Sequence, residues 1–100
     1  MIEVKSNVRF HESSFTSPGI MRVLSIADRE SPAGFNPVVL SAADGDHKIG
    51  SKHNTGNAFD ICTRYFPFDR QVWAMRMRER LGTDYFLLVE NDHIHVQFNG

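Results

Sequence analysis

Two short stretches carry most of the residues whose chemistry could build a catalytic site. The first runs from Ser51 to Asp60, and the second runs from Glu90 to His95. Between them they hold three of the five histidines and three carboxylates. Hydrolytic zinc sites use three ligands drawn from histidine and carboxylate side chains and leave one position for water. The two stretches therefore predict one zinc site that hydrolyses an amide bond.

The spacing within the first stretch suits two of the three ligands. His53 and Asp60 flank a turn that contains Gly56, which can take a positive φ angle and bring the histidine back beside the strand that follows. Asp60 lies among apolar neighbours, and burying a lone carboxylate is costly unless a cation or several donors compensate it. Taken singly, His53 could be a surface histidine and Asp60 a salt-bridged carboxylate, but together they indicate a metal site.

The third ligand has to come from the second stretch. His93 and His95 alternate on a predicted strand and share one face, so they point away from the core, although alternating histidines can also be a solvated face. A zinc ion lowers the pKa of a coordinated water to roughly 7, and a carboxylate must take the water proton. Asp92, three residues before His95, is the predicted base. Glu90 is the alternative base or a partner that orients a ligand.

The elements that must position these residues follow from periodicity and turn chemistry. A helix is expected over about 18–30 and a second from 67–69 to about 81, with strands at 38–40, 58–62, 84–89 and 93–98. Val4, Val8 and Phe10 suggest at best a short strand near the start, and 41–50 reads as a loop. This order predicts an α+β domain, an antiparallel sheet with helices packed on one side.

Composition narrows the class of protein. The 100 residues, 41% hydrophobic and 23% charged, fit a single domain over 1–100. A net charge of -1 gives no broad basic field, which disfavours nucleic-acid partners and a metal nuclease built on the histidine hairpin. No run approaches membrane-spanning length and no signal peptide opens the chain, so we expect synthesis in the cytoplasm and no membrane insertion. Oligomeric state is not readable from the sequence.

The two stretches resemble a superfamily of zinc peptidases, the D-alanyl-D-alanine carboxypeptidases and endolysins. Its pattern is a Ser-x-His-x-x-Gly-x-Ala-x-Asp block followed by a carboxylate and a His-x-His pair. The matching residues are Ser51, His53, Gly56, Ala58, Asp60, Asp92, His93 and His95. The compact form, with Asp44 and His47 ahead of the block, is similar to small phage-encoded members. The resemblance covers less than half of the chain.

The resemblance implies a role for each matching residue. His53, Asp60 and His95 would bind zinc, Asp92 would be the base, and His93 would stabilise the transition state. It also implies the fold, shared with the hedgehog signalling domain, and the substrate, which is the peptide stem of bacterial peptidoglycan cut at D-Ala-D-Ala or L-Ala-D-Glu. Such a protein would reach the cell wall after lysis, through a channel or inside a virion.

One departure from the family concerns substrate binding. Many members carry an arginine in the loop before the first histidine, and this chain has none there. Lys48, Lys52 or Arg64 could substitute, although a lysine lacks the bidentate fork of arginine. The candidate substrate-binding residues are Ser51, Lys52, Asp44, His47 and Arg64. The missing arginine also leaves open an alternative, a non-catalytic zinc-stabilised binding or structural domain of the same fold.

Overall fold

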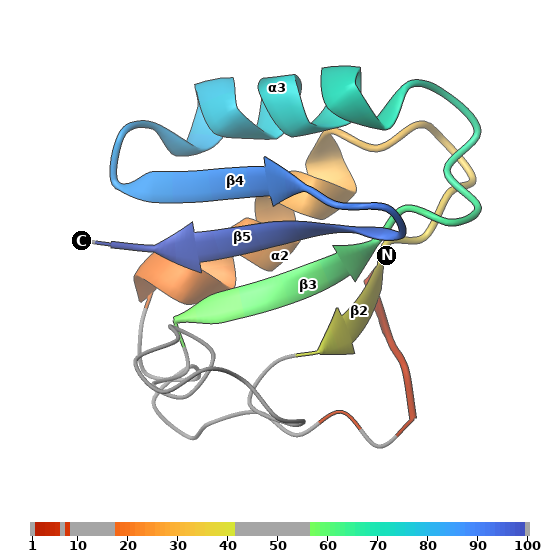
Figure 1. Cartoon of the computed structure of the whole chain (residues 1–100), viewed down its shortest axis with the longest axis horizontal. Helices are drawn as coiled ribbons and strands as arrows, with labels where there is room; N and C mark the ends of the chain where they lie inside the picture. Colours follow the sequence, from red (N-terminus) through yellow and green to blue (C-terminus); the bar gives the residue numbers. More distant parts are fainter. Residues whose placement is uncertain (1, 7, 9–17, 42–56, 100) are drawn as a thin grey trace.

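The computed structural model describes residues 2–6, 8, 18–41 and 57–99. Within these residues the elements follow the order β1, α2, β2, β3, α3, β4 and β5 (Figure 1). Their bounds are Glu3–Val4, Pro18–Arg29, Val38–Ser41, Ala58–Cys62, Arg70–Leu81, Tyr85–Val89 and His93–Phe98. From α2 onward this is the predicted order of helices and strands. Of the short strand suggested by Val4, Val8 and Phe10, β1 includes Val4 but not Val8, and Phe10 lies outside the described residues.

The described strands form one sheet in the order β1-β2-β3-β5-β4. The pairs β2–β3, β3–β5 and β5–β4 are antiparallel. Strand β1 pairs parallel with β2, because α2 lies between them in the chain and makes the crossover that parallel strands need. The predicted α+β class is therefore confirmed, with one short parallel pair added to the sheet. Strand β5 lies between β3 and β4, so the histidine-bearing strand is interior.

Helix α2 starts at the predicted proline and packs its first turn against the C-terminal hairpin. Pro18 suits this position because a first-turn residue needs no N–H donor within the helix. A Cβ added to Gly19 would come within 2.5 Å of the Phe98 ring, so any larger residue would require that ring to move. The Tyr85 hydroxyl donates a hydrogen bond to the Gly19 carbonyl at 2.5 Å. The start of α2 is thereby fixed against β4 and β5.

Helix α3 begins slightly later than the sequence indicated. The expected start was at 67–69, but Asp69 is the N-cap, and its carboxylate accepts a hydrogen bond from the Gln71 N–H at 2.8 Å. The predicted end is confirmed. Gly82 has a φ of 93° and donates its N–H to the Arg78 carbonyl at 3.0 Å, as a glycine C-cap does.

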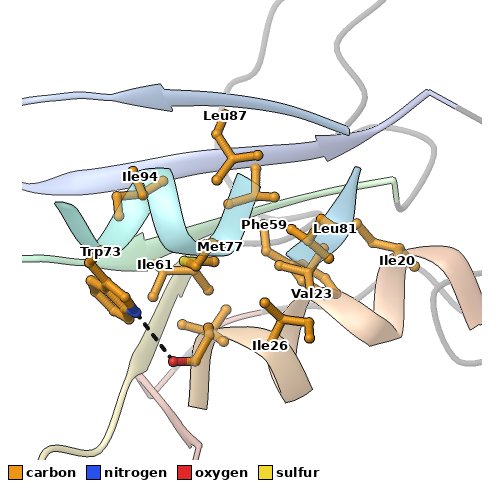
Figure 2. Packing of buried hydrophobic residues seen from close by; sticks show 14 residues of the cluster. Ile20, Val23, Ile26, Phe59, Ile61, Trp73, Met77, Leu81, Leu87 and Ile94 are labelled. Carbon is orange, nitrogen blue, oxygen red and sulfur yellow. Dashed lines mark hydrogen bonds between the residues drawn. The ribbon is translucent and has the colours of Figure 1, made fainter. Parts of the chain in front are cut away.

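The core lies between the two helices and one face of the sheet (Figure 2). Its helical members are Ile20, Val23, Ile26, Ala27, Trp73, Ala74, Met77 and Leu81, and its strand members are Val39, Phe59, Ile61, Leu87, Ile94 and Val96. The Trp73 indole N–H donates to the Ala27 carbonyl at 3.3 Å and joins the two helices. Alternate residues of β3 and β5 are thus fixed in the core, which turns the residues between them to the other face.

Candidate metal centre

Strands β3 and β5 pair so that predicted ligands lie directly opposite each other. Asp60 is the cross-strand partner of His95, and Cys62 is the partner of His93. Their neighbours along each strand belong to the core, so these side chains point to the opposite side of the sheet. We call that side the open face. On β3 and β5 it carries Asp60, Cys62, His93, His95 and Gln97.

Asp60 and His95 form the centre of this cluster. His95 Nδ1 lies 3.1 Å from Asp60 Oδ1, and His95 Nε2 lies 2.9 Å from Gln97 Oε1. Only 15% of the Asp60 side chain and 19% of the His95 side chain are exposed. The hydrogen bond to Asp60 is the main cause that raises the pKa of His95 above 6.5. Burial acts in the opposite direction, and Gln97 and Glu90 add smaller upward contributions. Both ring nitrogens of His95 therefore face acceptor oxygens, an arrangement that favours the protonated ring.

Asp92 pairs with its neighbour His93 where the hairpin turns. His93 Nδ1 lies 2.7 Å from Asp92 Oδ1, and this hydrogen bond lowers the pKa of Asp92 below 3.8. Arg64 lies 3.8 Å from the other carboxylate oxygen of Asp92, and its charge acts in the same direction. His93 Nε2 is 3.8 Å from Asp60 Oδ1. Asp92 and His93 thus extend the Asp60–His95 pair along the open face.

The turn that carries Asp92 is held by two neighbouring segments. The Thr63 N–H, which follows directly after β3, donates to the Asp92 carbonyl at 2.9 Å. The guanidinium of Arg70, in the first turn of α3, donates to the Asn91 carbonyl. Because both contacts come from segments fixed by the core, the position of Asp92 relative to the β3 carboxylate is set by the scaffold.

Glu90, the alternative base, lies on the other side of the same turn. Its backbone N–H donates to the His93 carbonyl at 2.8 Å. Its charge contributes to the raised pKa of His95, whereas Asp92 is hydrogen-bonded to His93. Each candidate base is therefore associated with a different histidine of the pair.

The structure places only part of the predicted site. Asp44, His47, Ser51, Lys52 and His53 lie outside the described residues. The remaining predicted residues are Asp60, Arg64, Glu90, Asp92, His93 and His95, and they lie on or beside the open face. Within the part of the chain that the structure describes, no three His, Cys, Asp or Glu side chains converge as a metal site requires. Of the three predicted ligands, the structure describes Asp60 and His95, and all three stay predictions.

The Asp60–His95 pair fits the dimensions of a zinc site. Ligand atoms about 2.0–2.1 Å from a tetrahedral zinc ion lie about 3.3 Å from one another. Asp60 Oδ1 and His95 Nδ1 are 3.1 Å apart, so little movement would be needed for both to bind one ion. A ligating histidine usually donates its second N–H to an oxygen, and Gln97 Oε1 is placed to accept it. Imidazole with carboxylate is also a donor set that zinc accepts.

Two cavities are lined by residues that the structure describes, and they lie in different parts of the molecule. The larger, of about 450 Å³, is lined by the ends of α2 and α3 and by aromatic residues such as Phe66 and Trp73. The described part of that lining holds no histidine, so we do not assign the chemistry to it. The smaller cavity, of about 410 Å³, includes Cys62, Arg64 and Asp92 in its lining. It therefore adjoins the His93 end of the open face.

Three contributors to the cluster were not predicted from the sequence. Gln97 orients His95, and its amide in turn donates to Asn99 Oδ1 at 3.0 Å. The half-exposed ring of Phe86 lies beside His95, with 6.4 Å between ring centroids. Alternation along β5 predicts that Gln97 shares the histidine face, but it does not indicate the hydrogen bond to His95. Arg70 had no such signal, because its contact with the turn joins residues distant in sequence.

Comparison of the chain with models of protein families, with curated proteins and with solved structures finds no match. The resemblance to zinc peptidases therefore depends on the motif residues alone. None of the helices in the described ranges is long and apolar enough to cross a membrane.

Proposed function

We propose that this chain is a zinc-dependent metallopeptidase that hydrolyses an amide bond in the peptide stem of bacterial peptidoglycan. One observation carries the proposal: Asp60 and His95, on adjacent strands, place two ligand atoms 3.1 Å apart. On the same face, the hydrogen-bonded pair Asp92 and His93 comes within 3.8 Å of Asp60. A carboxylate and an imidazole of this kind can move a proton and donate a hydrogen bond during amide hydrolysis.

Each residue of the candidate site would have its own role in amide hydrolysis. Asp60 and His95, together with His53, would hold the metal, and zinc would supply an acidified water and polarise the substrate carbonyl. Asp92 accepts the water proton and delivers it to the leaving amine. His93 keeps Asp92 ionised through Nδ1, and its Nε2, which faces Asp60 at 3.8 Å, is placed to stabilise the developing oxyanion.

The substrate class rests on the resemblance of the motifs to zinc peptidases of peptidoglycan. D-Ala-D-Ala and L-Ala-D-Glu are the bonds that the family cuts, and small members of this form are phage-encoded. Substrate cleavage by this chain would then occur at the bacterial cell wall.

Purified protein loaded with zinc should release new amino termini from isolated peptidoglycan. A chelator should abolish the release and added zinc should restore it. The variant Asp92→Asn should keep bound zinc but lose roughly 10²–10⁴-fold in turnover, since that is the usual contribution of a positioned general base. Glu90→Gln is the matched control and should lose much less. Absence of cleavage by zinc-loaded protein on several wall types would argue against the proposal.

A non-catalytic zinc-stabilised binding domain is the second candidate. It is favoured by the pKa of Asp92, which His93 lowers, because a weakly basic carboxylate is a poor acceptor of protons. The variant Asp92→Ala distinguishes the two functions. A catalyst would lose turnover, whereas a binding domain would retain both its zinc and its affinity for the wall.

A further inference from the structure

The larger cavity lies between the end of α2 and the start of α3, and part of its wall is aromatic. Phe66 lies flat on Trp73, with 4.4 Å between ring centroids and 3° between ring planes. Phe68 meets Phe66 edge-on at 6.4 Å, and 70% of Phe68 is exposed. Val72, in the first turn of α3, adds a second exposed apolar side chain to the lining. An aromatic wall that is open to solvent can accept a flat apolar group.

Two arginines line the same cavity from different helices. Arg29 is the last residue of α2, and Arg76 lies in the second turn of α3. Both are exposed, and neither forms an ion pair with an acidic side chain among the described residues. A guanidinium presents a planar fork of N–H donors that matches the two oxygens of a carboxylate. The cavity therefore combines an aromatic wall with two cations that can bind an anion.

The two acidic side chains in the described lining are already engaged within the protein. Glu30 lies 3.7 Å from Arg80, and only 15% of its side chain is exposed. Asp69 caps α3, where the helix N-terminus favours a negative charge, and it accepts a hydrogen bond from the Gln71 N–H at 2.8 Å. With Arg80 included, three cations lie around this cavity against two carboxylates. A ligand anion is thus favoured over a ligand cation.

We propose that this cavity binds a small aromatic acid, a molecule with one aromatic ring and one carboxylate on a short chain. The ring lies against Phe68 and Val72, and the carboxylate accepts hydrogen bonds from Arg29 and Arg76. The volume of about 450 Å³ falls within the range of roughly 300–1,000 Å³ that small-molecule sites occupy. The described lining shares no residue with the open face, so the inference does not depend on the proposed peptidase.

The test is an NMR titration of the full chain with three probes that separate the ring from the charge. They are 3-phenylpropionate, its amide, and butyrate, which lacks the ring. 3-Phenylpropionate should shift the methyl signals of Val72 and the indole N–H signal of Trp73, and the shifts should saturate. The amide and butyrate should each bind roughly tenfold more weakly, because one loses a charge-assisted hydrogen bond and the other loses the aromatic contact. Equal affinity for all three probes, or shifts confined to Val38 and Leu40 of the smaller cavity, would overturn the proposal.

The double variant Arg29→Gln/Arg76→Gln assigns the effect of charge to this cavity. Both arginines are exposed, so the fold should be kept, and the acid should bind no more tightly than the amide. Phe68→Ala should instead weaken the acid and the amide by the same factor, since it removes part of the aromatic wall and leaves both cations. The matched control is Arg64→Gln, an exposed arginine of the smaller cavity, which should keep the preference for the acid. A preference that persists in the double variant would refute the assignment.

Two further measurements distinguish the possible occupants of the cavity. A free aromatic acid and the last residue of a peptide that ends in phenylalanine offer the same ring and carboxylate. Binding of N-acetyl-Ala-Ala-Phe that is tighter than binding of 3-phenylpropionate would identify a peptide end, and weaker binding would identify a free acid. Cosedimentation with vesicles that contain phosphatidylglycerol tests a lipid surface. Vesicle binding that Arg29→Gln/Arg76→Gln abolishes, with no shift caused by 3-phenylpropionate, would identify an anionic membrane instead and overturn the proposal.

Discussion

The two faces of strands β3 and β5 are built from alternate residues of the same segments, yet they differ in the polarity and the contacts of their side chains. On the core face, Phe59, Ile61, Ile94 and Val96 have no exposed surface. On the open face, Asp60 and His95 are also largely buried, but they are bonded to each other and not to the core. Because residues alternate along a strand, the core face contributes to stability and the open face carries the proposed chemistry. A substitution on one face should therefore affect one of these properties and leave the other nearly unchanged.

Among substitutions on the open face, Asp60→Ala should have the largest effect on zinc binding and hydrolysis. We expect the variant to lose zinc binding and hydrolysis, because one of the proposed ligands is removed and the hydrogen bond that raises the pKa of His95 is lost with it. The metal-free protein should lose about 1.5–3 kcal/mol of unfolding free energy, the usual contribution of a hydrogen bond to a charged group. Zinc content after dialysis, assays of peptidoglycan cleavage and chemical denaturation measure the three quantities.

The control for this variant is the next residue along β3. Ile61→Val, on the core face, should cost about 0.5–1.5 kcal/mol and keep the full zinc content. Stoichiometric zinc in folded Asp60→Ala would show that the metal, if bound, lies elsewhere.

Ile94→Ala should have the largest effect on the core face. Ile94 is fully buried, so removal of its side chain should cost about 2–5 kcal/mol of unfolding free energy. The folded fraction should still bind zinc. His93→Ala, one residue earlier on the same strand, should cost about 1 kcal/mol or less, since it loses one hydrogen bond to a half-exposed carboxylate. Denaturation midpoints that shift equally for the two variants would refute the separation of the faces.

The same contrast explains how much could be predicted from the sequence. Strands β3 and β5 were predicted with their observed bounds, because alternation of polar and apolar residues is a local signal. That Asp60 and His95 are cross-strand partners was not predicted, since register depends on how the sheet packs on the helices. The parallel pairing of β1 was missed for a similar reason, because a two-residue strand has no periodicity of its own.

The candidate site, like the fold, could be predicted only in part from the sequence. The types of residue in the motifs indicated zinc chemistry, and the structure brings Asp60, His93 and His95 onto one face. The contacts that orient them were not predictable from spacing. The hydrogen bond from Arg70 to the Asn91 carbonyl needs α3 packed beside the hairpin, which only the tertiary structure supplies. His53 lies outside the described residues and stays a prediction.

Gln97→Ala should lower the zinc affinity of the open face without abolishing zinc binding. The variant removes the oxygen that accepts from His95 Nε2, and loss of such an orienting partner typically costs 10–100-fold in metal affinity. A competitive titration of zinc against a chelator measures the change. Gln97→Glu keeps an acceptor at the same place and should retain most of the affinity. An unchanged affinity in Gln97→Ala would mean that this contact does not orient a ligand.

The smallest effect concerns the pH dependence of stability in the metal-free protein. Because Asp60 raises the pKa of His95 above 6.5, the folded protein binds this proton more tightly than the unfolded chain. The resulting stabilisation is complete below pH 6.5 and is lost as the pH rises through the raised pKa. Zinc affinity should change in the opposite direction and increase over the same range, since ligation requires the deprotonated ring.

Chemical denaturation at a series of pH values, with and without zinc, measures both trends. His95→Gln should remove the decline in stability of the metal-free protein, whereas the core-face variant Ile61→Val should shift the whole profile downward without changing its shape. A decline that persists in His95→Gln would assign it to another group. Opposite slopes with and without zinc would indicate that proton and metal compete for one nitrogen, which is the behaviour that distinguishes a ligand from a histidine that only pairs with a carboxylate.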